Sequence, residues 1–143
     1  MKIAVASDHG GYQLKEAVKE YLKGRGIEFV DLGTYSEESV DYPIYGQTCA
    51  KAVAGGQAER GIVCCGTGIG ISIAANKTKG IRCALCTDVN MAELTRRHNN
   101  ANMLAMGGRI TDRETALKIT EAWLDTEFEG GRHQRRVSML DEM

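Results

Sequence analysis

The residues best suited to chemistry in this sequence are a cysteine and the glycine-rich turn that follows it, residues 65–70. Residues 62–65 form a short apolar, β-branched run that predicts a buried strand, and residues 71–77 continue in a helical pattern. A turn between a strand and a helix start gathers backbone N–H groups at the positive end of the helix. Such groups stabilise an anion or a developing oxyanion, and the same field favours the thiolate of Cys65. The sequence thus predicts a base beside an oxyanion-binding loop.

Known nucleotide-binding motifs do not explain this turn. Its pattern is G-x-G-x-G, and the third glycine of a dinucleotide-binding motif would fall on Ile71. Asp88 lies at about the ~20-residue ribose-binding spacing, but it precedes a helical pattern and is better interpreted as an N-cap. No G-x-x-x-x-G-K-[ST] motif is present. A tight turn that binds no ligand is the alternative interpretation.

The composition is that of an ordinary single domain over residues 1–143. The chain is 43% hydrophobic and 26% charged, with one proline, so it can form one core without disulfide or metal cross-links. The net charge of -1 argues against nucleic acid or an anionic membrane as the main partner. The chain begins with a strand pattern rather than a signal peptide, and no apolar run approaches the ~20 residues that cross a bilayer. We therefore expect a cytoplasmic protein.

The odd number of cysteines does not suggest a disulfide framework. Cys83 and Cys86 match C-x-x-C, but they lie in a strand-like run, where residues three apart point to opposite faces. This pair is therefore a poor zinc or redox site. We expect buried, reduced thiols at every cysteine except Cys65, namely at Cys49, Cys64, Cys83 and Cys86.

Apolar runs alternate with helical patterns along the whole chain. The predicted strands are residues 2–7, 27–32, 62–65, 81–86 and 103–106. The predicted helices are residues 14–22, 43–54, 71–77, 88–97, 111–124 and 132 onwards, with a capping box from Thr111 to Glu114. The alternation predicts an α/β fold: a three-layer α/β/α Rossmann-like sandwich with a five-stranded parallel sheet and an extra C-terminal helix.

Ligands of such sheets bind at the carboxyl ends of the strands, where the strand order reverses. If the order begins 2-1-3, Asp8 and His9 at the end of the first strand lie beside residues 65–70. Asp8 as a simple N-cap and His9 as a surface histidine are the alternatives. Fold and motif together indicate one crevice.

Several basic residues have two interpretations. Arg132 and Arg136 lie four residues apart on the last helix, where they form either a solvated basic face or a phosphate clamp. Arg96 and Arg97 end the fourth helix, where cations suit the helix dipole. Arg109 follows the fifth strand at its carboxyl end, where we expect its charge to face a ligand.

Six short motifs in this order resemble the type B ribose-5-phosphate isomerases, a family that also includes isomerases of galactose 6-phosphate and allose 6-phosphate. The resemblance covers nearly the whole chain. The motifs are Asp8-His-Gly-Gly11, Asp41-Tyr-Pro43, Cys65-Gly-Thr-Gly-Ile-Gly-Ile-Ser72, Ala74-Ala-Asn-Lys77, Arg97-His-Asn99 and Glu129-Gly-Gly-Arg-His133.

The resemblance implies a role for each matching residue. Cys65 would take the proton from the sugar carbon next to the carbonyl. Some relatives use a carboxylate just after the third glycine, but that position here is Ile71. The loop amides that would hold the enediolate belong to Gly66, Thr67, Gly68, Ile69 and Gly70. The ring-opening residues would be Asp8, His98 and Thr67. Asn99 and Tyr42 would line the sugar site, and the phosphate would lie among His9, Arg109, Arg132 and Arg136.

The resemblance implies an aldose–ketose isomerase that interconverts ribose 5-phosphate and ribulose 5-phosphate. A hexose 6-phosphate isomerase and a non-catalytic subunit of a hetero-oligomer are the alternatives. The reaction needs no metal and no cofactor, and no cluster of metal ligands is evident in the sequence.

The position of His98 predicts an assembly. His98 lies in a helix-to-strand connection, which passes the amino ends of the strands, whereas Asp8 and Cys65 lie at the carboxyl ends. A five-residue strand is roughly 17 Å long, so His98 would serve the site of a neighbouring subunit. We expect a homodimer, or a dimer of such dimers, with an active site shared between subunits.

Overall fold

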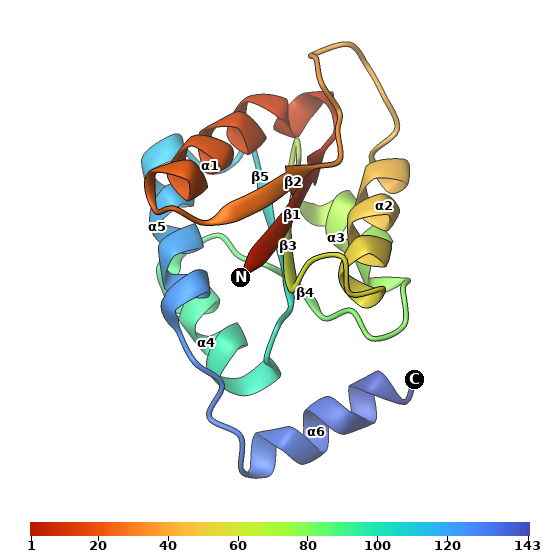
Figure 1. Cartoon of the computed structure of the whole chain (residues 1–143), viewed down its shortest axis with the longest axis vertical. Coiled ribbons are helices and arrows are strands. Elements are labelled where there is room, and N and C mark those ends of the chain that lie inside the picture. Colours follow the sequence, from red (N-terminus) through yellow and green to blue (C-terminus); the bar gives the residue numbers. More distant parts are fainter.

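Five parallel strands form one sheet in the computed structural model, which describes residues 1–143 (Figure 1). The strands are β1 (Lys2–Ser7), β2 (Glu28–Asp31), β3 (Arg60–Cys65), β4 (Cys83–Leu85) and β5 (Met103–Gly107). The helices are α1 (Tyr12–Gly24), α2 (Tyr42–Ala54), α3 (Ile69–Asn76), α4 (Val89–Asn99), α5 (Arg113–Asp125) and α6 (Arg132–Asp141). A short 3-10 helix, η1 (His9–Gly11), joins β1 to α1. None of the helices has both the length and the apolar character that a bilayer crossing requires.

The strand order is β2-β1-β3-β5-β4, so the predicted start, 2-1-3, is confirmed. β5 lies between β3 and β4, although it follows both of them in the chain. Ser7 pairs with Cys64, and Cys65 pairs with Gly107, so the last residues of β1, β3 and β5 lie side by side. The loops that follow these three strands therefore share one edge of the sheet.

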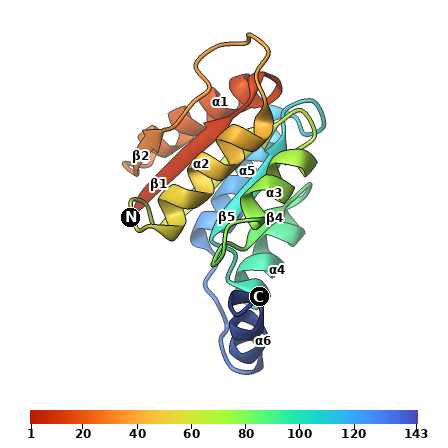
Figure 2. The same ribbon diagram turned by 90° about the vertical axis from the view of Figure 1, so that its right-hand side faces the viewer.

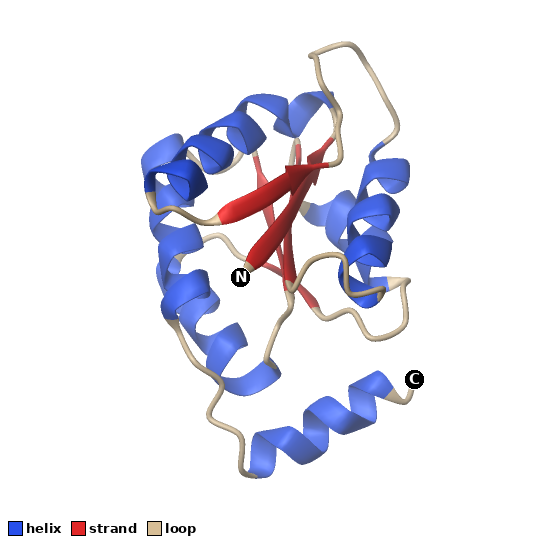
Figure 3. Cartoon of the chain, viewed as in Figure 1, coloured by secondary structure: helices blue, strands red, loops and turns tan.

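Helices cover both faces of the sheet, which confirms the predicted three layers (Figures 2 and 3). α1, α4 and α5 bury their apolar residues on one face, and α2 and α3 bury theirs on the other. Successive strand residues point to opposite faces. Cys64 accordingly joins the core under α1, α4 and α5, whereas Cys65 joins the core under α2 and α3. All five cysteines are free and buried.

α6 stands apart from these layers and extends past the amino ends of the strands (Figure 1). Only two of its residues, His133 and Val137, are buried. Arg132 and Arg136 are exposed on the same helix. Near its end, Asp141 accepts a hydrogen bond of 2.5 Å from Arg82, which also donates to the carbonyls of Asn99 and Asn100. We refer to residues 126–141 as the C-terminal arm.

Most predicted element boundaries differ from the observed ones by one or two residues, and hydrogen bonds explain two of these differences. Thr111 does not cap α5, because its own N–H donates to the Gly107 carbonyl within the turn after β5. Asp112 is the N-cap instead and accepts from the Thr115 N–H. The strand predicted at residues 81–86 is only Cys83–Leu85, because the N–H of Arg82 donates to the side chain of Asn102.

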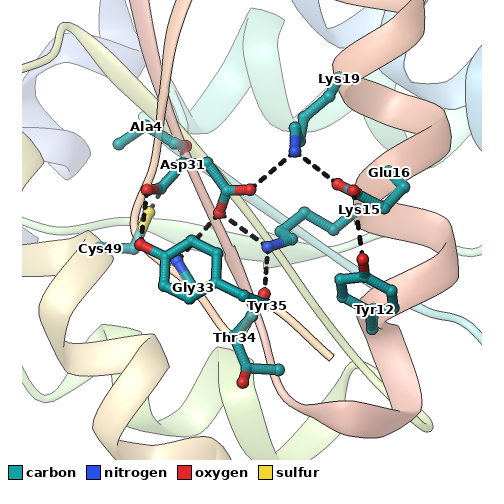
Figure 4. Close-up of polar contacts among 10 residues, drawn as sticks. All are labelled: Ala4, Tyr12, Lys15, Glu16, Lys19, Asp31, Gly33, Thr34, Tyr35 and Cys49. Atoms are coloured by element: carbon teal, nitrogen blue, oxygen red, sulfur yellow. Dashed lines mark hydrogen bonds and ion pairs between the residues drawn. The ribbon is translucent and has the colours of Figure 1, made fainter. Parts of the chain in front are cut away.

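A buried lysine ties α1 to the loop after β2 (Figure 4). The Lys15 side chain is 1% exposed, and its Nζ lies 2.7 Å from Asp31 Oδ1 and donates to the Thr34 carbonyl. Lys19 Nζ contacts the other carboxylate oxygen of Asp31 at 2.8 Å. Burial raises the pKa of Asp31, but hydrogen bonds from Lys15, Lys19 and the Gly33 N–H outweigh it and hold this pKa below its usual value. The loop that leads to α2 is therefore anchored at its start.

Replacing Lys15 by methionine is expected to lower the free energy of unfolding by about 3 kcal/mol or more, because Asp31 loses its buried partner. Lys19→Met is the matched control and should cost less, since Lys19 is more exposed. Because the folded-state pKa of Asp31 is depressed, its contribution is complete above its unfolded pKa and is lost as the pH falls through the folded value. Urea denaturation at neutral and acidic pH measures both effects. Equal stability of Lys15→Met and wild type would contradict this assignment.

Candidate active site

Cys65 is the last residue of β3, and the turn after it points an amide at its sulfur. The Gly68 N–H donates to Cys65 Sγ at 3.1 Å, which would stabilise negative charge there. Gly68 has a φ of 81°, and a Cβ on it would lie 2.7 Å from Leu85 Cδ1, so this position requires glycine. The Ile69 N–H donates to Thr67 Oγ1, whereas the N–H groups of Gly66 and Thr67 have no partner within the chain. The Gly70 N–H in the first turn of α3 likewise has no partner, so these three amides are the free donors of the turn.

Asp8 and His9 follow β1 directly and lie beside this turn. Asp8 is 7% exposed, and its Oδ1 accepts from the Gly11 N–H at 3.1 Å, so it does cap η1. His9 Nδ1 accepts from the Val40 N–H at 3.1 Å. A neutral His9 therefore carries its proton on Nε2 and presents a donor there.

Arg109 completes the same crevice from the turn after β5. Its N–H donates to the Gly66 carbonyl at 2.9 Å. Its guanidinium covers two glycines: a Cβ on Gly10 would lie 3.3 Å from its Cζ, and a Cβ on Gly66 would lie 3.2 Å from Nη1. The ring of Tyr42 lies against Gly70, where a Cβ would be 2.6 Å from the ring. We call the space bounded by residues 8–10, 65–70 and 109 the crevice.

The remaining predicted site residues lie at the other end of the sheet. His98 and Asn99 end α4, just before Asn102, whose carbonyl accepts from the Gly61 N–H near the amino end of β3. Arg132 and Arg136 are on the C-terminal arm, and neither has an ion-pair partner within the chain. A five-residue strand spans roughly 17 Å. One chain therefore holds two separate groups of site residues.

The two arginines at the end of α4 differ from each other. Arg96 is 5% exposed and donates to the Ala101 and Thr126 carbonyls, so it joins α4 to the segment after α5. Burial, together with the charges of Arg60 and Arg82, lowers the pKa of Arg96 to about 10. The position of Arg96 at the end of α4 is therefore explained mainly by these hydrogen bonds and not by the helix dipole. Arg97 is exposed and forms an ion pair with Glu93.

The structure also groups three residues that the sequence did not connect. One ligand atom from each of His98, Glu129 and His133 lies within 4.8 Å of the others. The expectation that the chain has no cluster of possible metal ligands is wrong in this respect. The imidazoles of His98 and His133 are stacked, however, with centroids 4.3 Å apart and planes inclined by 15°. In-plane lone pairs of nearly parallel rings do not converge on one ion. His133 belongs to the motif Glu129-Gly-Gly-Arg-His133, but no role in the site was predicted for it, because its contact with His98 cannot be read from the sequence.

A cavity of about 560 Å³ lies away from the crevice. It is beside the C-terminal arm, between Leu140 and Met143 on one side and residues 76–84 on the other. Arg82 and Asn99 are among its lining residues. The space beside the arm is therefore open in the single chain.

Comparisons with known proteins show the family of this chain. The profile of the Ribose/Galactose Isomerase family matches residues 3–140. Ribose-5-phosphate isomerase B of Escherichia coli is 50% identical over 139 residues, which are 97% of this chain and 93% of the relative. The structure of ribose-5-phosphate isomerase B from Clostridium thermocellum superposes with a TM-score of 0.98 at 54% identity, over 99% of this chain and 96% of the other.

A galactose-6-phosphate isomerase subunit of Clostridium acetobutylicum is 40% identical over 144 residues, which are 100% of this chain and 83% of the relative. The matches extend over nearly the whole chain and include the strands, the turn after Cys65 and the C-terminal arm. The chain belongs to the ribose/galactose isomerase family.

Proposed function

We propose that this chain is an aldose–ketose isomerase, one domain over residues 1–143, that interconverts ribose 5-phosphate and ribulose 5-phosphate. The observation that carries the proposal is the Gly68 N–H directed at Cys65 Sγ, 3.1 Å away, in a crevice that also holds Arg109. Two relatives that share half or more of their residues with this chain are named ribose-5-phosphate isomerase B, which supports the choice of substrate.

The chemistry is a proton transfer between neighbouring carbons. The thiolate of Cys65 takes the proton from the carbon next to the carbonyl and returns it to the adjacent carbon, while the hydroxyl proton passes from the oxygen that becomes the new carbonyl to the former carbonyl oxygen. The enediolate formed between these steps carries negative charge on oxygen, which the free N–H groups of Gly66 and Thr67 can stabilise. Preorganised donors of this kind lower the barrier without reorganising during the reaction.

Opening of the furanose ring and binding of the phosphate involve both groups of residues. Asp8 and Thr67 act from the crevice, and His98 and Asn99 act from the end of α4. His9 offers its Nε2–H to the phosphate next to Arg109. Arg132 and Arg136 have no partners of their own and supply the second half of the phosphate site.

A homodimer brings the two groups together if the C-terminal arm of each subunit reaches the crevice of the other. The open cavity beside the arm supports this arrangement. So do exposed apolar residues on both elements, Ile69 and Ile73 on α3 and Met139 and Leu140 on α6. A dimer of such dimers is compatible with the same contacts. A cytoplasmic location agrees with five free thiols in one chain.

A coupled assay with ribose 5-phosphate tests the proposal. We expect turnover on the pentose phosphate with a higher kcat/KM than on galactose 6-phosphate or allose 6-phosphate. A higher kcat/KM on a hexose phosphate would favour the alternative that the galactose-6-phosphate isomerase relative supports. Activity that appears only after a second type of subunit is added would identify a hetero-oligomer.

Substitution of Arg132 or Arg136 by alanine is expected to raise KM for ribose 5-phosphate by about 10- to 100-fold. The reason is the loss of a charged hydrogen bond to the phosphate, worth about 1.5–3 kcal/mol. Arg135 is the matched control, because it is exposed on another side of the same helix, and Arg135→Ala should leave KM nearly unchanged. Steady-state kinetics measure the effect. If all three variants have the KM of the wild type, Arg132 and Arg136 form only a solvated basic face.

A further inference from the structure

His133 is a buried imidazole that no step derived above uses. It lies in the first turn of α6 and is 8% exposed, whereas its neighbours Arg132 and Gln134 are exposed. Its ring stacks on that of His98, with centroids 4.3 Å apart and planes inclined by 15°. A polar ring is thus buried against a residue that the proposed reaction needs.

Glu129 completes this cluster from the turn before α6. Its Oε1 lies 3.5 Å from His133 Nε2 and 4.0 Å from His98 Nε2. The N–H of Glu129 donates to the Arg97 carbonyl at 3.1 Å, and the N–H of His133 donates to the Gly130 carbonyl at 3.1 Å. The turn is therefore hydrogen-bonded to the end of α4 beside His98, and this contact keeps His133 against the ring of His98.

The surroundings favour a neutral ring at His133. Burial lowers its pKa, and the positive charges of a protonated His98, of Arg132 and of Arg136 act in the same direction, while Glu129 opposes them. A neutral imidazole can lie face to face with His98 in either protonation state of His98. Two stacked imidazolium ions would repel each other.

His98 needs such a support, because its side chain is 41% exposed and has no hydrogen bond within the chain. An exposed histidine at a helix end samples several rotamers, since few neighbours restrict it. Proton transfer to a sugar oxygen requires one direction of the ring nitrogen, and a misplacement of about 1 Å can cost about 100-fold in rate.

We propose that His133 is a positioning residue for His98: its stacked ring, held by the Glu129 turn, fixes the imidazole of His98 in the orientation that ring opening requires. This inference rests on the function proposed for His98. His133 itself touches no substrate, so its effect should appear in kcat rather than in KM.

The test compares His133→Ala, His133→Phe and Val137→Ala in the full chain with ribose 5-phosphate. His133→Ala should lower kcat by about 10- to 100-fold with little change in KM. His133→Phe keeps a flat ring against His98 and should recover most of kcat. Val137 is the other buried residue of α6, so Val137→Ala loosens the arm without removing the stack and should retain kcat within about twofold.

A double-mutant cycle separates positioning through His98 from a general structural role. His98→Ala alone should lower kcat by about 100- to 10,000-fold, which leaves activity measurable at high enzyme concentration. Adding His133→Ala to it should cost nothing further. An equal loss in both backgrounds, or an equal loss in Val137→Ala, would overturn the inference while leaving the role of His98 intact. A fully active His98→Ala would overturn the inference together with the proposed role of His98.

Discussion

Substitution of Cys65 by alanine is expected to reduce kcat for ribose 5-phosphate by about 10,000-fold, the upper end of what a general base contributes. The thiol is the one group in the turn after β3 that can take a proton, since the position after the third glycine is Ile71. The free N–H groups of Gly66 and Thr67 and the charge of Arg109 are unchanged in the variant. Binding of ribose 5-phosphate, measured by calorimetry, should therefore persist. Near-wild-type turnover of Cys65→Ala would eliminate the mechanism.

Alkylation provides an independent check on the same thiol. Burial raises the pKa of Cys64 far above its usual value and raises the pKa of Cys49 and Cys86 to about 12. Cys65 by contrast accepts an amide hydrogen bond at its sulfur. Iodoacetamide should therefore modify Cys65 before the other cysteines, and substrate should slow this modification. Mass spectrometry of partially labelled protein identifies the site.

Mixing two strongly impaired variants, Cys65→Ala and His98→Ala, is expected to restore activity once the subunits exchange. The structure holds the crevice and the end of α4 at opposite ends of the strands, so each site of a dimer would combine two chains. A mixed dimer then has one site in which both residues are intact. It should show up to about half the activity of a wild-type dimer, because the contacts of a two-fold dimer are reciprocal.

Two further mixtures are matched controls for this experiment. Cys65→Ala with Asp8→Ala combines two defects of the crevice, and His98→Ala with Arg136→Ala combines two defects outside it. In either mixed dimer, each site still contains one defect. Neither mixture should therefore exceed the activity of its two parent variants, measured well below KM so that the Arg136→Ala defect also lowers the rate. If the first pair also fails to recover despite demonstrated exchange, His98 acts on its own chain or not at all.

The sequence predicted the arrangement of the fold well where local patterns suffice. All five strands and the α/β/α layers follow from alternating apolar runs and helical periodicity, and Asp88 caps α4 through the Met91 N–H as expected. The errors came from hydrogen bonds between distant segments. Asn102 binds the N–H of Arg82 and shortens β4, and no pattern within residues 81–86 indicates this.

Placement of the site residues was predictable for the crevice and less so for the arm. Strand ends and the turn motif indicated Asp8, His9 and Cys65 together, because parallel strands end at one edge. The stack of His98 and His133 depends on how the C-terminal arm folds back onto α4. That contact joins residues 35 positions apart through an irregular turn, so periodicity carries no information about it.

The C-terminal arm carries two interleaved sets of residues on a single helix. Arg132 and Arg136 form the outward set, and His133 and Val137 form the inward set, each with a spacing of four. A one-residue insertion between Glu129 and Arg132 would shift both sets by one helix position, about 100°, which brings the arginines to the inward positions and removes His133 and Val137 from them. Length changes in this segment should therefore be strongly counterselected. Extensions after Asp141 leave the phase of the helix intact, so the chain can acquire a longer tail without losing either set.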